Sequence, residues 1–167
     1  MPGVGKTQTA IEYAHRYRTD YVAVLWSHAG SPEILTSGYL ALALLLGLPK
    51  RDEPDRAAAL ASVQDWLRHT PGWLMILDGV DGLSAVKELL PTDGPGHLLL
   101  TTRDPAVVGL VTGVEVSKMS PEEGARLLLR RAVRLAPEAT LEQAAVVDRD
   151  AALATSIAVD GDRKAHV

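Results

Sequence analysis

Close to its first residue the chain places a glycine-rich turn directly before a helical pattern. The turn reads Gly3-Val4-Gly5-Lys6-Thr7, and Ala10, Ile11, Ala14 and Tyr17 then recur at helical spacing. Glycine reaches positive φ and lets an anion approach the backbone closely. A helix N-terminus attracts negative charge through its unpaired N–H groups. The sequence therefore predicts that this turn binds phosphate.

The spacing of the turn matches the second half of a known phosphate-binding pattern. That pattern is Gly, four residues, then Gly-Lys-Ser/Thr, and Gly5-Lys6-Thr7 supplies its end, whereas its first glycine would fall immediately before Met1. In such a loop the lysine reaches the β- and γ-phosphates, and the threonine hydroxyl is a magnesium ligand. The triplet alone fits an ordinary glycine turn equally well, so other residues have to decide.

Apolar runs and helical patterns alternate along the rest of the chain. Strands are predicted at residues 21–26, 73–77 and 97–100, with a weaker one at 114–116. Helices are predicted from Ser31-Pro32 to Gly47, from about Pro54 through Leu67, over residues 85–90, from Ser120 to about Ala136, and from Thr140. This order predicts an α/β domain with a parallel sheet and helices on both faces.

Polar residues follow two of these strands directly. Asp78 closes the run 73–77, and a carboxylate at the mouth of a buried strand is where nucleotide-hydrolysing proteins hold magnesium. Arg103 follows the next strand, where a fixed guanidinium beside the γ-phosphate distinguishes ATP from ADP. Singly, Asp78-Gly79 is also a common turn pair, and an arginine after a strand is commonly solvated. The ordered set of three elements favours a ligand site.

Four segments, in this order and spacing, resemble the NB-ARC domains of STAND-type P-loop NTPases, notably the bacterial ones. They are residues 1–7, 25–29, 74–81 and 98–104, and the resemblance covers about residues 1–135. It implies that the nucleotide is bound by Gly3, Val4, Gly5, Lys6, Thr7 and Gln8. It also implies that Asp78 is the Walker B acid and Arg103 the sensor arginine. Lys6, Asp78 and Arg103 are then the catalytic candidates, and Thr7 and Asp78 the magnesium ligands.

The resemblance also carries a domain organisation and a function. It implies a P-loop NTPase sheet in residues 1–117 without its first strand, then a partial helical subdomain in 118–155 that closes over the nucleotide. Residues 156–167 are expected to be a disordered tail. Family members hold ADP at rest and exchange it for ATP when an attached sensor domain detects a signal. We therefore expect ADP or ATP with Mg²⁺ as ligands, and other domains or proteins of a signalling assembly as partners.

The chain departs from the family at three places. A strand inside the sheet, ending in glycine, should precede Met1, and its loss would leave neighbouring backbone groups unpaired at about 1–3 kcal/mol each. Gly79 stands where many relatives have a second acid that helps to activate water, so we expect slow hydrolysis or none, with Asp81 as a substitute. No Gly-Leu-Pro segment follows Thr140, so the lid over the nucleotide is expected to be incomplete.

Composition excludes several other classes of function. The net charge of −4 gives no basic field for nucleic acid or an acidic membrane surface. Without cysteine there are no disulfides or thiolate metal sites, and the five histidines have no metal-ligand spacing. The longest apolar stretch, residues 39–48, is about half of the ~20 residues that cross a bilayer. We expect a cytoplasmic protein that binds neither membrane nor nucleic acid through this segment.

Three alternatives stay open on the sequence. A degenerate fragment would act only as a protein-interaction module and bind no nucleotide. A small-molecule kinase would share the phosphate loop, although the Thr-Thr-Arg strand and the capped helix after Ser120 favour the switch. In the third alternative, the chain is the ATPase part of a transcriptional regulator whose DNA-binding part lies outside it.

Overall fold

The computed structural model describes residues 4–48, 56–105, 107, 111–134, 136–144, 146 and 148–155, and only the backbone of Leu83 and Ala85. Gly3, the predicted helix start at Pro54 and the predicted tail 156–167 lie outside this part. The chain divides into two compact units, Met1–Val116 and Ser117–Val167. None of the helices in the described part combines the length and the apolar character needed to cross a membrane.

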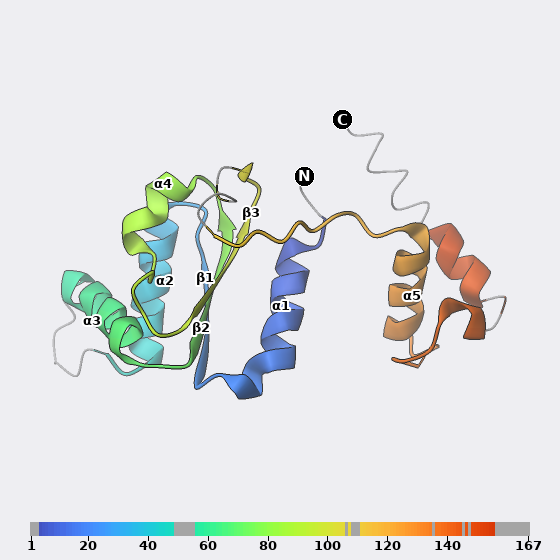
Figure 1. Cartoon of the computed structure of the whole chain (residues 1–167), viewed down its shortest axis with the longest axis horizontal. Coiled ribbons are helices and arrows are strands. Elements are labelled where there is room, and N and C mark those ends of the chain that lie inside the picture. The colour runs from blue at the N-terminus through green and yellow to red at the C-terminus, as the bar shows by residue number, and fades with distance from the viewer. Residues whose placement is uncertain are drawn as a thin grey trace. The chain divides into compact units, whose positions relative to one another are not determined.

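The first unit alternates helices and strands (Figure 1). Its elements are α1 (Lys6–Tyr17), η1 (Arg18–Asp20), β1 (Ala23–His28), α2 (Pro32–Leu45), α3 (Arg56–His69), β2 (Trp73–Val80), α4 (Leu83–Val86), η2 (Lys87–Leu89) and β3 (His97–Thr102). Ser31 caps α2 by accepting a hydrogen bond from the backbone N–H of Ile34, and Pro32 occupies the first helical position. Ser31 and Pro32 are the residues from which the start of this helix was predicted.

Among the described residues the three strands form one parallel sheet in the order β1-β2-β3. In the ladder, His28 lies opposite Asp78 and Leu77 lies opposite Leu100. Helices α2 and α3 connect β1 to β2, and α4 and η2 precede β3. Because all strands run in the same direction, their carboxyl ends lie side by side at the same end of the sheet. The predicted α/β class, with a parallel sheet flanked by helices, is confirmed.

Helices cover both faces of the sheet, with α1 on one side and α2 and α3 on the other (Figure 1). Consecutive residues of β2 serve the two faces in turn, as the strand period of two requires. Leu74 and Ile76 pack with Ala10 of α1, whereas Met75 and Leu77 pack with residues of α2 and α3. A strand buried on both faces is an unbroken apolar run, which is how β2 reads in the sequence.

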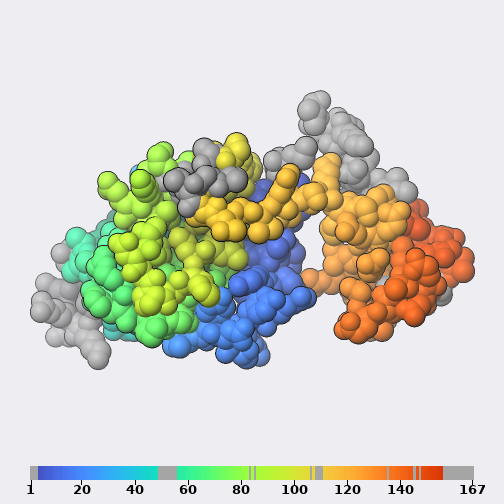
Figure 2. Space-filling model, in the orientation of Figure 1, coloured from blue at the N-terminus to red at the C-terminus, as the bar shows by residue number. Residues whose placement is uncertain are grey.

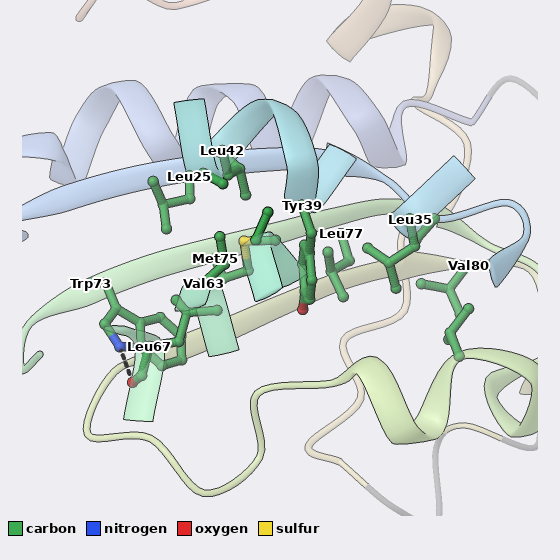
Figure 3. Close-up of a cluster of buried hydrophobic side chains, with 14 of the residues drawn as sticks. Leu25, Leu35, Tyr39, Leu42, Val63, Leu67, Trp73, Met75, Leu77 and Val80 are labelled. Carbon is green, nitrogen blue, oxygen red and sulfur yellow. Dashed lines mark hydrogen bonds between the residues drawn. The ribbon is translucent and has the colours of Figure 1, made fainter. Parts of the chain in front are cut away.

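The larger core lies between the sheet, α2 and α3, and contains Leu25, Leu35, Tyr39, Leu42, Val63, Leu67, Trp73, Met75, Leu77 and Val80 (Figure 3). The indole N–H of Trp73 donates to the carbonyl of Leu67 at 2.7 Å, so this large ring is buried with its polar atom satisfied. Tyr39 donates its hydroxyl to the carbonyl of Leu89, and burial raises its pKa. The chain has no phenylalanine, and the largest fully buried side chains of this core are those of Trp73 and Tyr39.

The segment after η2 lies against α3 (Figure 2). Two of its glycines allow a close approach to α3 and to Trp73. A Cβ on Gly94 would lie 2.4 Å from the carbonyl oxygen of Leu67. One on Gly96 would lie 2.1 Å from the ring of Trp73. Neither position leaves room for a side chain, so the backbone of this segment packs directly against α3 and the ring of Trp73.

The strand predicted at residues 114–116 is wrong. Residues 111–120 contain no strand, and Val114 is 84% exposed. The run of residues 114–116 is shorter than a typical strand, and the exposed Val114 gains no apolar burial that would favour pairing. β1 also begins and ends two residues later than predicted, which brings His28 into the sheet.

The second unit begins with α5 (Pro121–Arg131). Ser120 accepts a hydrogen bond from the backbone N–H of Glu123, and the Glu123 carboxylate accepts one from the N–H of Ser120. This reciprocal pair is the capping box that the sequence predicted. Ala125 and Leu129 of α5 form a small core with Leu141, Ala144 and Ala152.

The end of α5 differs from the prediction, because the helix stops at Arg131 and does not continue to Ala136. Val133 has φ 58, and the N–H of Arg134 bonds back to the carbonyl of Leu129 at 2.8 Å. A left-handed residue with such a return bond terminates a helix. The helix predicted at Thr140 begins as the single turn η4 (Leu141–Gln143), and residues 148–155 are helical.

Candidate functional site

The glycine-rich turn leads straight into α1. Gly5 is the N-cap residue with φ 100 and ψ 9, a left-handed conformation that favours glycine. Its carbonyl accepts the backbone N–H of Thr9 at 2.8 Å and the Thr9 hydroxyl at 3.0 Å. The first turn of α1 contains no acidic residue to occupy its positive end. Gly5 therefore has the left-handed backbone expected of the predicted turn, and that the turn binds an anion stays a prediction.

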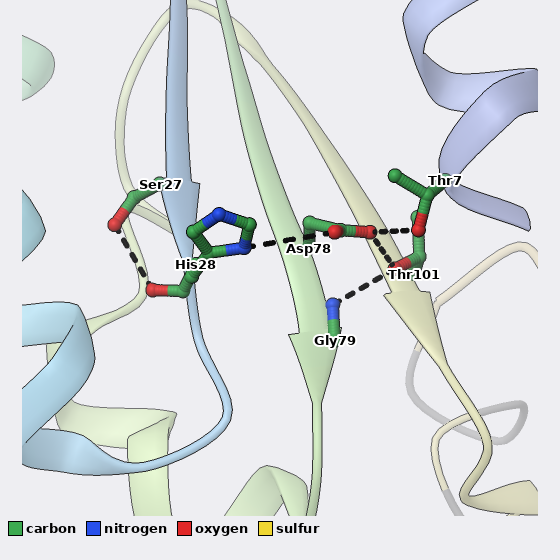
Figure 4. Close-up of polar contacts among 6 residues, drawn as sticks. All are labelled: Thr7, Ser27, His28, Asp78, Gly79 and Thr101. Atoms are coloured by element: carbon green, nitrogen blue, oxygen red, sulfur yellow. Dashed lines mark hydrogen bonds and ion pairs between the residues drawn. The ribbon is translucent and has the colours of Figure 1, made fainter.

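Asp78 lies at the end of β2 and is 8% exposed. Its Oδ1 accepts hydrogen bonds from two hydroxyls, that of Thr7 at 2.8 Å and that of Thr101 at 2.6 Å. Its Oδ2 lies 3.7 Å from Nδ1 of His28. Figure 4 shows the carboxylate between His28 on one side and the two threonines on the other. Residues of α1, β1, β2 and β3 thus converge on one carboxylate.

Further hydrogen bonds fix the backbone around this carboxylate. The carbonyl of Asp78 accepts the N–H of Ala29 at 2.9 Å. The N–H of Gly79 donates to the Thr101 hydroxyl at 2.8 Å, and the Thr102 hydroxyl donates to the carbonyl of Val80 at 2.7 Å. Gly79 has φ 75, another left-handed value. The carboxyl ends of β2 and β3 are therefore joined by side chains as well as by the ladder.

A hollow of about 570 Å³ opens beside these groups. It is lined by residues 4–8 of the loop and α1, residues 79–80 after Asp78, and residues 101–103 at the end of β3. Lys6 and Arg103 both line it, so two cationic side chains far apart in sequence share one cavity. Asp78 adjoins it through Thr7 and Thr101. Asp81, the predicted substitute acid, is exposed and is not among the described residues that line the hollow.

The oxygens at this site fit magnesium. In the described part of the chain, no group of three or more His, Asp or Glu side chains is placed to hold a metal ion. Magnesium, however, commonly takes one or two protein oxygens and completes its shell with water and phosphate oxygens. The Thr7 hydroxyl and the Asp78 carboxylate, 2.8 Å apart beside the hollow, form such a donor pair. Water and the oxygens of a bound phosphate would have to supply the remaining ligands.

Sequence reasoning missed two residues of this arrangement. Thr101 belongs to the Thr-Thr-Arg segment, and the sequence predicts no role of its own for it. His28 lies two residues beyond the strand predicted at residues 21–26 and has no predicted role. Strand alternation, which turns every second residue of β3 toward one face, was the available signal for Thr101. For His28 the signal was absent, because its place depends on where β1 ends.

Comparison with known proteins adds no relative. No family model matches the chain, and no curated protein matches it significantly. The function is therefore argued from the residues of the site.

Proposed function

We propose that the chain is the core of a magnesium-dependent, ADP- and ATP-binding signalling switch of the NB-ARC type. One observation carries this proposal. Lys6 and Arg103 line the same hollow that begins at the Gly5 turn, and the Thr7–Asp78 pair adjoins it. A nucleoside di- or triphosphate needs these parts together: an anion-binding turn, mobile cations, and oxygens for magnesium.

Each residue of the site has a role in this proposal. The turn around Gly5 and the start of α1 would hold the phosphates through backbone N–H groups, and Lys6 would neutralise the outer phosphates. Thr7 and Asp78 would hold magnesium, which supplies charge neutralisation between the phosphates when it is bound. Arg103 would contact the phosphate that ATP has and ADP lacks, so that the site distinguishes the two nucleotides.

Slow hydrolysis, or none, is part of the proposal. The residue after Asp78 is Gly79, which has no side chain to take a proton from water. Its N–H is used to bond Thr101. The protein would then work through the difference between its ADP and ATP states, passing it to other domains or proteins of a signalling assembly in the cytoplasm.

Titration of the chain with fluorescent ADP in the presence of Mg²⁺ tests the proposal. Loss of a charge-assisted contact is worth about 1.5–3 kcal/mol, so Lys6→Ala is expected to weaken binding about 10-fold to 100-fold. Arg16→Ala is the matched control, because Arg16 is an exposed cation of the same helix whose partner is Glu12. Equal affinity in the wild type and Lys6→Ala would remove the site assignment. Absence of binding by the wild type would favour the interaction module.

A further inference from the structure

Thr101 makes two hydrogen bonds at the junction of β2 and β3. It is 6% exposed, donates to Oδ1 of Asp78 at 2.6 Å and accepts the N–H of Gly79 at 2.8 Å. One hydroxyl thus holds both the side chain of Asp78 and the backbone of the next residue. Figure 4 shows it beside Thr7, with both hydroxyls directed at the same carboxylate.

The ladder between the two strands is irregular at this point. Leu77 pairs with Leu100, but the next pair is Val80 with Thr102, so the register shifts across Asp78 and Gly79. Regular backbone pairing therefore does not fix the carboxylate relative to β3. The bonds of Thr101 connect the two strands across this interruption, two positions before Arg103.

We propose that Thr101 is a positioning residue, which orients the Asp78 carboxylate toward bound magnesium and ties it to β3, the strand that Arg103 follows. The inference rests on the proposed function and adds to it a residue with no role in the resemblance. Oδ1 accepts hydrogen bonds from both Thr7 and Thr101, so the carboxylate cannot rotate without breaking a bond. Groups that orient a metal-binding carboxylate typically contribute 10-fold to 100-fold to metal affinity.

The test compares fluorescent-ADP affinity with Mg²⁺ and with EDTA in three variants. Thr101→Val keeps the shape and removes the hydroxyl, and Thr101→Ser restores it. Thr36→Val is the matched control, because the Thr36 hydroxyl bonds the Pro32 carbonyl within α2, away from the hollow. If Thr101→Val does not unfold in one cooperative thermal transition, Thr101→Ala takes its place with the same expectation.

We expect Thr101→Val to lower the magnesium enhancement of ADP affinity about 10-fold or more, with unchanged affinity in EDTA. Thr101→Ser and Thr36→Val should retain the wild-type enhancement. In an Asp78→Asn background, Thr101→Val should cause no further loss, since its effect acts through that carboxylate. A wild-type enhancement in Thr101→Val, or a full additional loss in the Asp78→Asn background, overturns the inference alone. A wild type that binds no ADP overturns the proposed function and the inference with it.

Discussion

The hydroxyl of Thr7, in the first turn of α1, donates a hydrogen bond of 2.8 Å to Oδ1 of Asp78 at the end of β2. The two residues are 71 positions apart, so only the fold brings them together. Both were selected from the sequence as magnesium ligands, one from a glycine-rich turn and the other from the end of a buried strand. The two proposed magnesium ligands of the nucleotide site are therefore in direct contact.

Asp78→Asn should reduce the affinity for ADP measured with Mg²⁺ about 10-fold or more, and leave the affinity in EDTA unchanged. An amide offers magnesium one neutral oxygen where the carboxylate offers two charged ones. Calorimetric titration under both conditions measures the effect. Asp65→Asn is the control, because Asp65 is an exposed acid of α3 that contacts His69. An equal loss with and without Mg²⁺ would mean that Asp78 acts on the fold and not on the metal.

Arg103→Ala should weaken ATP binding about 10-fold to 100-fold while ADP binding changes little. Arg103 lines the hollow, and a charge-assisted bond from its guanidinium to the terminal phosphate would be worth about 1.5–3 kcal/mol. Competition of ATP and ADP against a fluorescent nucleotide gives the two affinities. Arg68→Ala, in the last turn of α3, serves as the control. Equal weakening of both nucleotides would remove the sensing role.

Gly96→Ala should destabilise the first unit by about 1–3 kcal/mol or more, because the added methyl group would lie 2.1 Å from the buried ring of Trp73. Urea unfolding followed by tryptophan fluorescence measures the change. Gly30→Ala is the control, since its Cβ would meet only ordinary contacts at 3.7 Å and 3.9 Å. Equal stability of the two variants would show that the segment after η2 does not pack against Trp73.

Val133→Gly should stabilise the second unit by roughly 0.5–1 kcal/mol. Valine at φ 58 carries the left-handed cost of about 1–2 kcal/mol, and glycine removes it while adding some chain entropy to the unfolded state. Val133 is 89% exposed, so little packing is lost. Thermal unfolding of the variant, with Val114→Gly as the exposed control outside regular structure, checks the sign. A lower melting temperature for Val133→Gly would contradict the structure at this helix end.

Elements with strong local signals could be predicted from the sequence. The apolar run ending in Asp78 predicted the buried central strand, and Ser120 with Glu123 predicted the capped start of α5. Features that depend on distant partners could not. Residues 114–116 alternate in the manner of a strand, yet no other element packs over Val114 to bury it, and no strand forms there. The end of α5 could not be predicted either, because valine occupies the left-handed position at residue 133, where a glycine would have indicated a helix end.

The candidate site divides in the same way. The residue types of Lys6, Thr7, Asp78 and Arg103 suggested phosphate and metal chemistry before their positions were known. The structure brings them around or beside one hollow, but their roles toward nucleotide stay predictions. Strand alternation could indicate the face on which Thr101 lies, but its bonds to Asp78 and Gly79 could not be predicted, because they depend on the register shift between β2 and β3.

Nuclear magnetic resonance of the isotopically labelled chain during titration with Mg²⁺ and ADP tests the central claim most directly. The account predicts saturable shifts in the backbone amide signals of Gly5, Lys6, Thr7, Gly79 and Thr102, which surround the hollow. No saturable shift, or shifts confined to residues away from the hollow, such as those around Arg130 and Arg134, would contradict it.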